Sequence, residues 1–312
     1  MENFAVNLKF NLQFDLQRFA DVCKIGNTNY ESITAAITAA SSGDTITMLA
    51  DVTGLSSAIN INKEITLDLN GKTISGSINS KGIFNIVSGG NLTVTDSSSG
   101  GTIENTDQLG YAIDNRGKVD ISGGTFIGDS AVIRNSEGGK VTISGGNFTG
   151  NTVAIENRDE STVEISGGTF TSEYTAIDNG KYGTIEISGG TFSGFQYAID
   201  NSGTVDISGG TFTGEIENFE EGTITISGGT FNKNVASVSG VTIATGYAVA
   251  NNGDGTYTVS EVTDITKTET IDGVTVTLTF DSSSNNLKNA EGTGVTYDSE
   301  NNQFTCHNHR QN

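Results

Sequence analysis

A ten-residue motif, VDISGGTFTG at residues 205–214, recurs with small changes five more times along this chain of 312 residues. When the copies are aligned on the Ile before Ser-Gly-Gly, they lie 22, 22, 22, 20 and 19 residues apart. Such a period is typical of solenoids, in which each repeat forms one coil that stacks on its neighbours. The aligned residues are Ile121, Ile143, Ile165, Ile187, Ile207 and Ile226.

A second pattern, Ile followed by a variable residue and Asn, precedes every copy of the motif. The distance from this Ile to the motif Ile is either eight or ten residues, and the distance from the motif Phe to the next such Ile is seven residues in four of five cases. Side chains alternate between the two faces of a strand, so a change of two residues in the preceding turn leaves the same residues of the next strand facing inward. The even step therefore indicates strands.

Each repeat reads as three short strands. Val205 and Ile207 point to one side of the first strand and Asp206 to the other, Gly-Gly then turns the chain, and Phe212 belongs to the next strand. The residues equivalent to Val205 are nearly all β-branched, which suits a buried strand face. They are Val119, Val141, Val163, Ile185, Val205 and Ile224.

We therefore expect an all-β fold, a right-handed parallel β-helix of about nine coils. A leucine-rich repeat is excluded by the missing leucine framework, and a calcium-binding nonapeptide roll by the wrong period. Coils stack at about 4.8 Å, so like residues form ladders that run along the molecule. The expected aromatic stack is Phe126, Phe148, Phe170, Phe192, Phe212 and Phe231. The expected amide ladder is Asn115, Asn135, Asn157, Asn179, Asn201 and Asn218.

The region before the repeats predicts a cap. Residues 30–52 read as a short amphipathic helix and a first strand, with Ile33, Ala36, Ile37 and Ala40 on one helix face. A capping helix of this kind covers the exposed core and strand edge of a first coil. We expect an amphipathic segment or leader at residues 1–28, the capped β-helix at 29–260, and a small C-terminal cap or the start of a further domain at 261–312.

The first residues alternate between apolar and mostly polar side chains from Phe4 to Leu16, which predicts a long two-faced strand. Two interpretations stay open. The strand docks on its own rod or cap, or it adds to a sheet edge of another subunit and drives self-association. No apolar run reaches the length of a transmembrane helix.

Several motifs together resemble the pectin-lyase-like β-helices of bacterial surface and secreted proteins. They are GDTITML, ITLDLNGKTISG, the repeated ISGGTF and GYAVANNGDGTYTV, and they cover about residues 30–259. The resemblance implies an extracellular or cell-surface location. It is specific for fold and weak for function, because that superfamily includes lyases and hydrolases as well as adhesins and phage tailspikes.

Charge and cysteine content limit the choice of partners. The formal net charge is −21, which repels phosphate backbones and excludes nucleic acid as a partner. Cys23 and Cys306 lie near opposite ends of the chain, so an elongated fold keeps them from forming a disulfide.

Two columns of outward side chains are the candidate functional surface, and nine of their twelve members are carboxylates. Stacked like charges repel, so either water screens them or a cation such as calcium binds between them; we favour a solvated acidic face. The candidate calcium ladder is Asp114, Asp120, Glu156, Glu164, Asp178, Glu186, Asp200 and Asp206. No cofactor is required for the fold.

Arg134 lies between Asp114 and Glu156 in one column, one coil from each. Charge compensation explains this arrangement, but a pectate-lyase-like enzyme also places an arginine base beside calcium-binding acids. Against catalysis, the turns are short and predict flat faces without a concave pocket. The histidines of the sequence, His307 and His309, lie in the terminal tail, where a metal site with Cys306 is not expected.

The sequence thus favours a non-catalytic rod, adhesin-like binding surface or self-assembling surface component. A calcium-dependent polysaccharide lyase is the first alternative, and a phage tailspike or tail fibre is the second. Carbohydrate or another host or cell-surface ligand is a candidate partner, because Tyr111, Tyr174 and Tyr197 near the turns have rings that stack on sugars; the alternative is that these rings are partly buried at the turns.

Overall fold

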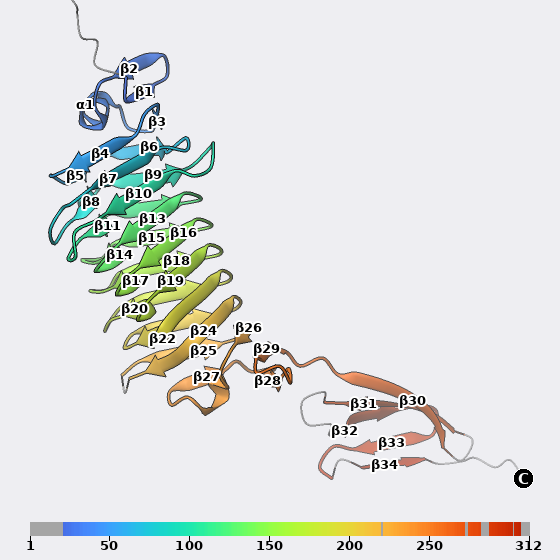
Figure 1. The fold of residues 1–312 in the computed structure, drawn as a ribbon. Coiled ribbons are helices and arrows are strands. Elements are labelled where there is room, and N and C mark those ends of the chain that lie inside the picture. Colours follow the sequence, from blue (N-terminus) through green and yellow to red (C-terminus); the bar gives the residue numbers. More distant parts are fainter. Residues whose placement is uncertain (1–20, 220, 272–273, 282–286, 302, 307–312) are drawn as a thin grey trace, which may run out of the picture.

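The computed structural model describes residues 21–219, 221–271, 274–281, 287–301 and 303–306. Its main body is a right-handed parallel β-solenoid of about eight turns, close to the nine coils expected. Figure 1 shows an elongated rod that runs from the capping elements to a small β unit at the C-terminal end. The segment from Phe4 to Leu16, and the two histidines, lie outside the described residues.

Each turn of the solenoid contributes one strand to each of three ladders. We name these the ISGG, Phe and Asn ladders after the residues that mark them. The ISGG ladder contains, in order, β3 (Asp44–Met48), β6 (Glu64–Asp68), β9 (Asn91–Thr95), β12 (Lys118–Ile121), β15 (Lys140–Ile143), β18 (Thr162–Ile165), β21 (Thr184–Ile187), β23 (Thr204–Ile207), β25 (Thr223–Ile226) and β27 (Val241–Ile243).

The other two ladders belong to one sheet and join within single long strands near its end. The Phe ladder contains β4 (Val52–Leu55), β7 (Thr73–Gly76), β10 (Thr102–Asn105), β13 (Thr125–Gly128), β16 (Asn147–Gly150), β19 (Thr169–Ser172), β22 (Thr191–Asn201), β24 (Thr211–Asn218) and β26 (Gly229–Phe231). The Asn ladder contains β5 (Ile59–Ile61), β8 (Gly82–Ile86), β11 (Tyr111–Asn115), β14 (Ala131–Asn135), β17 (Val153–Asn157), β20 (Thr175–Asn179) and the second halves of β22 and β24.

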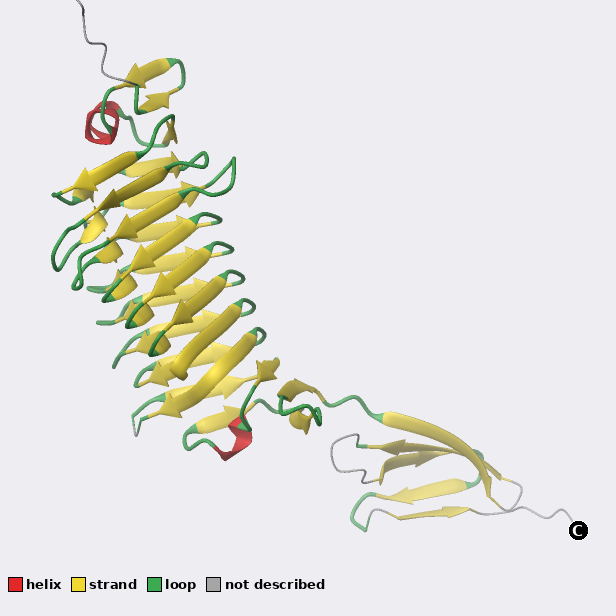
Figure 2. Cartoon of the chain, viewed as in Figure 1, coloured by secondary structure: helices red, strands yellow, loops and turns green. Residues whose placement is uncertain are grey.

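The pairing confirms the alignment read from the sequence. Strands of neighbouring turns are parallel and in register, so Val119 lies opposite Val141 and Ile121 opposite Ile143. The predicted inward residues are buried, because hydrophobic side chains from all three ladders fill the interior. Figure 2 shows the strands of successive turns stacked along the rod.

The aromatic stack is confirmed. Its six rings are fully or almost fully buried, and consecutive ring centroids are 4.7 to 4.9 Å apart with planes within 9° of parallel. The two-residue changes in turn length leave this column undisturbed, because they occur at the other side of the coil.

The amide ladder is also confirmed. Asn115 donates through Nδ2 to Oδ1 of Asn135 at 2.7 Å, and the same bond repeats from each asparagine to the next as far as Asn218. Most members also donate to a carbonyl oxygen of their own turn, as Asn157 does to Ser161 at 3.0 Å. The column therefore satisfies buried polar groups of the turn while it fixes the register between coils.

The N-terminal cap is built around α1 (Ile33–Ala39). Ile33, Ala36 and Ile37 are buried against the first coil, as expected from the sequence. Ser32 caps the helix N-terminus by accepting from the Ala35 amide at 3.1 Å. At the other end, Lys63 donates through Nζ to carbonyl oxygens of the last helical turn, which ties the helix to the first coil.

A hairpin of β1 (Cys23–Ile25) and β2 (Thr28–Tyr30) adds to this cap. Strand β1 pairs antiparallel with β3 and covers the edge of the ISGG ladder. The cap therefore begins before residue 29, the boundary expected from the sequence. Cys23 is buried there, and burial raises the pKa of its thiol to about 11. Cys23 and Cys306 are both free thiols.

The far end of the rod is closed by a hairpin of β28 (Tyr247–Asn251) and β29 (Tyr257–Glu261), preceded by a short 3-10 helix, η1 (Val235–Ser237). Strand β29 pairs antiparallel with β26 and covers the last Phe-ladder strand. The two strands are joined by a tight turn at residues 252–255, with positive φ at Gly253 and Gly255.

The C-terminal region forms a separate small unit rather than a cap on the rod. It contains β30 (Ile265–Ile271), β31 (Val274–Phe280), β32 (Leu287–Glu291), β33 (Val295–Asp298) and β34 (Gln303–Cys306). Val276, Leu278 and Ala290 are buried in a hydrophobic cluster of its own. Of the helices in the described ranges, none has the length and apolar character needed to cross a membrane.

Replacing Asn157 by Ala tests the amide ladder. The change removes a fully buried side chain that donates to Asn179 at 2.9 Å and accepts from Asn135 at 2.9 Å. Loss of a buried hydrogen-bond partner costs about 1–3 kcal/mol, so we expect a clearly lower thermal unfolding midpoint by circular dichroism. The control is Asn151→Ala, at an exposed turn position; equal midpoints for the two variants would contradict a stabilising ladder.

Candidate functional site

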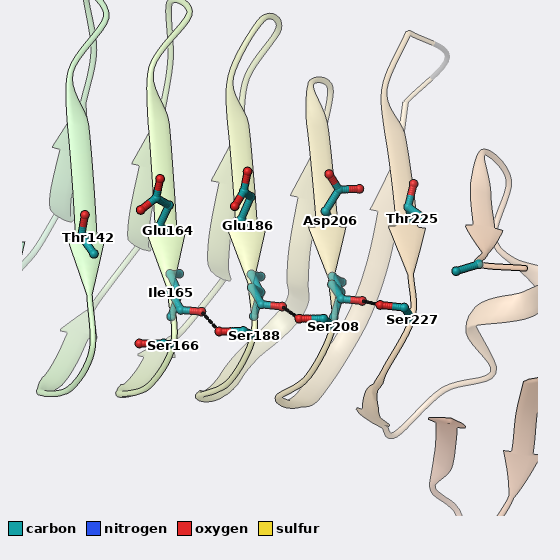
Figure 3. Close-up of a pocket in the computed structure, with 13 residues that line it drawn as sticks. Thr142, Glu164, Ile165, Ser166, Glu186, Ser188, Asp206, Ser208, Thr225 and Ser227 are labelled. Carbon is teal, nitrogen blue, oxygen red and sulfur yellow. Dashed lines mark hydrogen bonds between the residues drawn. The ribbon is translucent and has the colours of Figure 1, made fainter. Parts of the chain in front are cut away.

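The ISGG ladder presents the first outward column. Register pairing places Thr142, Glu164, Glu186, Asp206 and Thr225 opposite one another on five successive strands. Figure 3 shows their side chains projecting side by side from one face of the sheet. This surface is an open hollow of about 630 Å³.

One wall of the hollow is a serine ladder that the sequence analysis missed. Each serine after the motif Ile donates its hydroxyl to the carbonyl oxygen of the motif Ile one coil earlier, as Ser188 does to Ile165 at 3.3 Å (Figure 3). The same bond joins Ser144, Ser166, Ser208 and Ser227 to their preceding coils. The recurrence of Ser in every ISGG was the available signal. These hydroxyls are engaged with the backbone, so they serve the fold.

The carboxylates of this column are mostly solvated. Glu164 forms an ion pair with Lys140 at 2.5 Å, and Asp120 with Lys118 at 2.6 Å. Within the described part of the chain, Glu186 and Asp206 have no ion pair, and both are exposed. Water screens such surface charges, and exposed ion pairs contribute little stability.

The second outward column lies on the Asn ladder and is more enclosed. Asp114 is only 2% exposed and forms an ion pair with Arg116 at 2.9 Å. Burial raises the pKa of Asp114, and the charges of Arg116 and Arg134 oppose that rise. Arg116 also approaches Glu137 at 3.2 Å.

A second arginine neutralises the middle of this column. Arg158 contacts Glu156 at 3.3 Å and Asp178 at 2.5 Å. Burial raises the pKa of Asp178, and the Arg158 charge opposes that rise. Asp200 lies one coil further along the column. Burial is the main cause that raises its pKa, and the negative charge of the neighbouring Asp178 raises it further.

Arg116 and Arg158 are the main counter-ions of the enclosed column, and neither was predicted from the sequence. Each follows the ladder asparagine and lies two residues after an acid of the column, which places the two side chains on the same side of the chain. That i, i+2 spacing was the signal for the pairs Asp114–Arg116 and Glu156–Arg158.

The lyase candidate Arg134 lies in register with Asp114 and Glu156, as expected. Its Nε is 3.8 Å from a carboxylate oxygen of Glu156, and its guanidinium lies over the Tyr111 ring, 5.6 Å from the centroid. Both contacts engage the cation. Tyr111 and Tyr197 are half-buried, and Tyr174 is exposed.

The candidate calcium ladder divides between the two columns. Asp120, Glu164, Glu186 and Asp206 lie on the ISGG ladder; Asp114, Glu156, Asp178 and Asp200 lie on the Asn ladder. No set of three or more His, Cys, Asp or Glu side chains in the described ranges is grouped to hold a metal ion. Side chains in line along a ladder leave each cation few ligands, whereas calcium takes six to eight oxygens.

Comparisons of this chain with protein-family models, with curated proteins and with solved structures found no match.

Replacing Asp200 by Asn tests the electrostatics of the enclosed column. A carboxyl whose pKa is higher in the folded protein than in the unfolded chain binds protons on folding, so its ionisation opposes folding as pH rises through the shifted pKa. We therefore expect Asp200→Asn to raise the thermal midpoint at neutral pH and to lose this advantage as pH falls to about 4.

The matched control is Asp206→Asn, because that carboxylate is exposed and solvent-screened. We expect a smaller change in its midpoint. A lower midpoint for Asp200→Asn at neutral pH would show that the carboxylate has a stabilising partner, contrary to this account.

Proposed function

We propose that this chain is a non-catalytic β-helical rod of a bacterial surface or secreted protein, which presents a binding surface along its length as adhesins do. The observation that carries the proposal is the amide ladder, unbroken from Asn115 to Asn218. A continuous ladder makes a stiff, extended body of stacked coils. Such a body suits a spacer or display scaffold outside the cell.

The arrangement of charge supports the same proposal. A lyase needs an arginine free to act as a base, whereas Arg134 contacts Glu156 and Tyr111. Arg116 pairs with Asp114 and Arg158 with Asp178, which offsets part of the negative charge of the enclosed column. The exposed acids on the ISGG ladder keep this face of the sheet solvated and hinder face-to-face association of rods by charge repulsion.

The calcium-dependent polysaccharide lyase remains the alternative, favoured by one observation: Arg134 lies between two acids of neighbouring coils. The experiment incubates the full chain with polygalacturonate and calcium chloride and follows the absorbance of unsaturated products. We expect no cleavage. Cleavage that is lost in Arg134→Ala would overturn the proposal in favour of the lyase.

Solution mass with and without calcium tests the assembly of the rod. We expect calcium to change neither the mass nor the thermal midpoint more than magnesium does at equal ionic strength. A trimer would favour the tailspike alternative. Self-association through Phe4–Leu16 predicts that deletion of residues 1–20 lowers the mass of any oligomer; an unchanged oligomer would exclude that route.

A further inference from the structure

The repeat has one odd-numbered irregularity. The motif Phe and the next Ile are seven residues apart in four coils, but Phe212 and Ile216 are only four apart. In the structure, Ser193 pairs with Thr213 and Tyr197 with Glu215, with a register shift between these two pairs. The three residues between Ser193 and Tyr197 on β22 therefore lie opposite a single residue, Gly214, on β24, and a second register shift follows between Tyr197 and Ile199.

This shortening leaves an open hollow of about 670 Å³ at the turn between the Phe and Asn ladders. Its floor includes two glycines that no other residue can replace. A Cβ at Gly194 would lie 1.8 Å from the Tyr197 carbonyl oxygen, and one at Gly214, which has a φ of 124°, would lie 2.5 Å from the Gly194 carbonyl oxygen.

Two aromatic rings line the hollow. Phe195 is 90% exposed and Tyr174 is 56% exposed. Their turns are bonded together, because the amides of Gln196 and Tyr197 both donate to the Tyr174 carbonyl oxygen, at 3.0 and 3.1 Å. The two rings are therefore displayed from a rigid support, although exposure of large apolar side chains is unfavourable for the free protein.

Polar side chains surround the rings. Glu215 and Lys233 lie 3.8 Å apart as an exposed ion pair, and Gln196 contributes an exposed amide. Asn232 uses Oδ1 to accept from the Gly214 amide at 3.1 Å. The hollow is thus lined by two aromatic rings together with several hydrogen-bond donors and acceptors. Small-ligand sites commonly have this composition.

We propose that this hollow binds a neutral oligosaccharide built of pyranose units. The apolar C–H face of a pyranose packs on an exposed aromatic ring, and its hydroxyl groups accept and donate hydrogen bonds at the surrounding amide, carboxylate and ammonium groups. One cation and one anion leave the hollow without net charge, while the net charge of −21 disfavours polyuronates.

The proposal rests on the proposed binding role of the rod and gives it a ligand class and a location. A protein partner fits less well, because two rings within a polar surround supply little of the roughly 800 Å² per partner that a stable protein interface buries. A second copy of this chain at the same hollow is an outcome that the experiment separates.

The experiment applies the full chain to a glycan array that carries neutral, uronate-containing and sialylated glycans. We expect binding to at least one neutral glycan, and titration calorimetry with that glycan then compares variants. Phe195→Leu keeps an apolar side chain but loses the ring, so we expect affinity to fall about tenfold or more, whereas Phe195→Tyr retains it.

Tyr182→Ala is the matched control, because Tyr182 is an exposed aromatic outside this hollow. We expect unchanged glycan affinity. Binding to charged glycans alone, no binding to the array, or equal affinity of Phe195→Leu and the unmodified chain would overturn the proposal. A lower oligomer mass in Phe195→Leu would assign the hollow to self-association. Each result is independent of the polygalacturonate assay, so failure of the glycan site leaves the rod proposal standing.

Discussion

The hydrogen bond from one asparagine amide to the next is the interaction on which the regularity of this molecule depends. Each coil leaves polar groups of its turn inside the rod, where an unpaired group is costly. The Asn135 side chain donates to the Gly139 carbonyl oxygen of its own turn and to Asn157 on the next coil. One side chain thus pairs a buried backbone group and links two neighbouring coils. Register is fixed at that point, and the rings of Phe148 and Phe170 then stack without adjustment.

The sequence was sufficient to predict those parts of the fold that repeat. Parallel stacking puts equivalent residues beside one another, so a column such as Phe126 to Phe231 is readable once the period is known. The even steps in turn length predicted strands for the same reason. Helix α1 was predictable because Ile33, Ala36 and Ile37 follow a helical spacing and bury on the first coil.

Contacts that occur in only one or two coils could not be predicted from the period of the repeat. Arg116 and Arg158 occur in only two turns; Arg116 pairs with Asp114 on its own coil, whereas the pairing of Arg158 with Asp178 depends on how far a flexible side chain reaches to the next coil. Flat faces were expected from the short turns, and that prediction was wrong: the three-residue deletion before Ile216 opens a hollow beside Phe195. The regular columns build the rod, and we infer that the departures from them carry its binding specificity.

The claim that the ladders unite the coils is tested most directly by amide hydrogen exchange of the full chain, followed by mass spectrometry. Coils joined by the asparagine column open together, so peptides from residues 131–218 should exchange last and at similar rates, well after those from the C-terminal unit with its own small core. A central coil that exchanges as fast as the C-terminal unit would contradict the account.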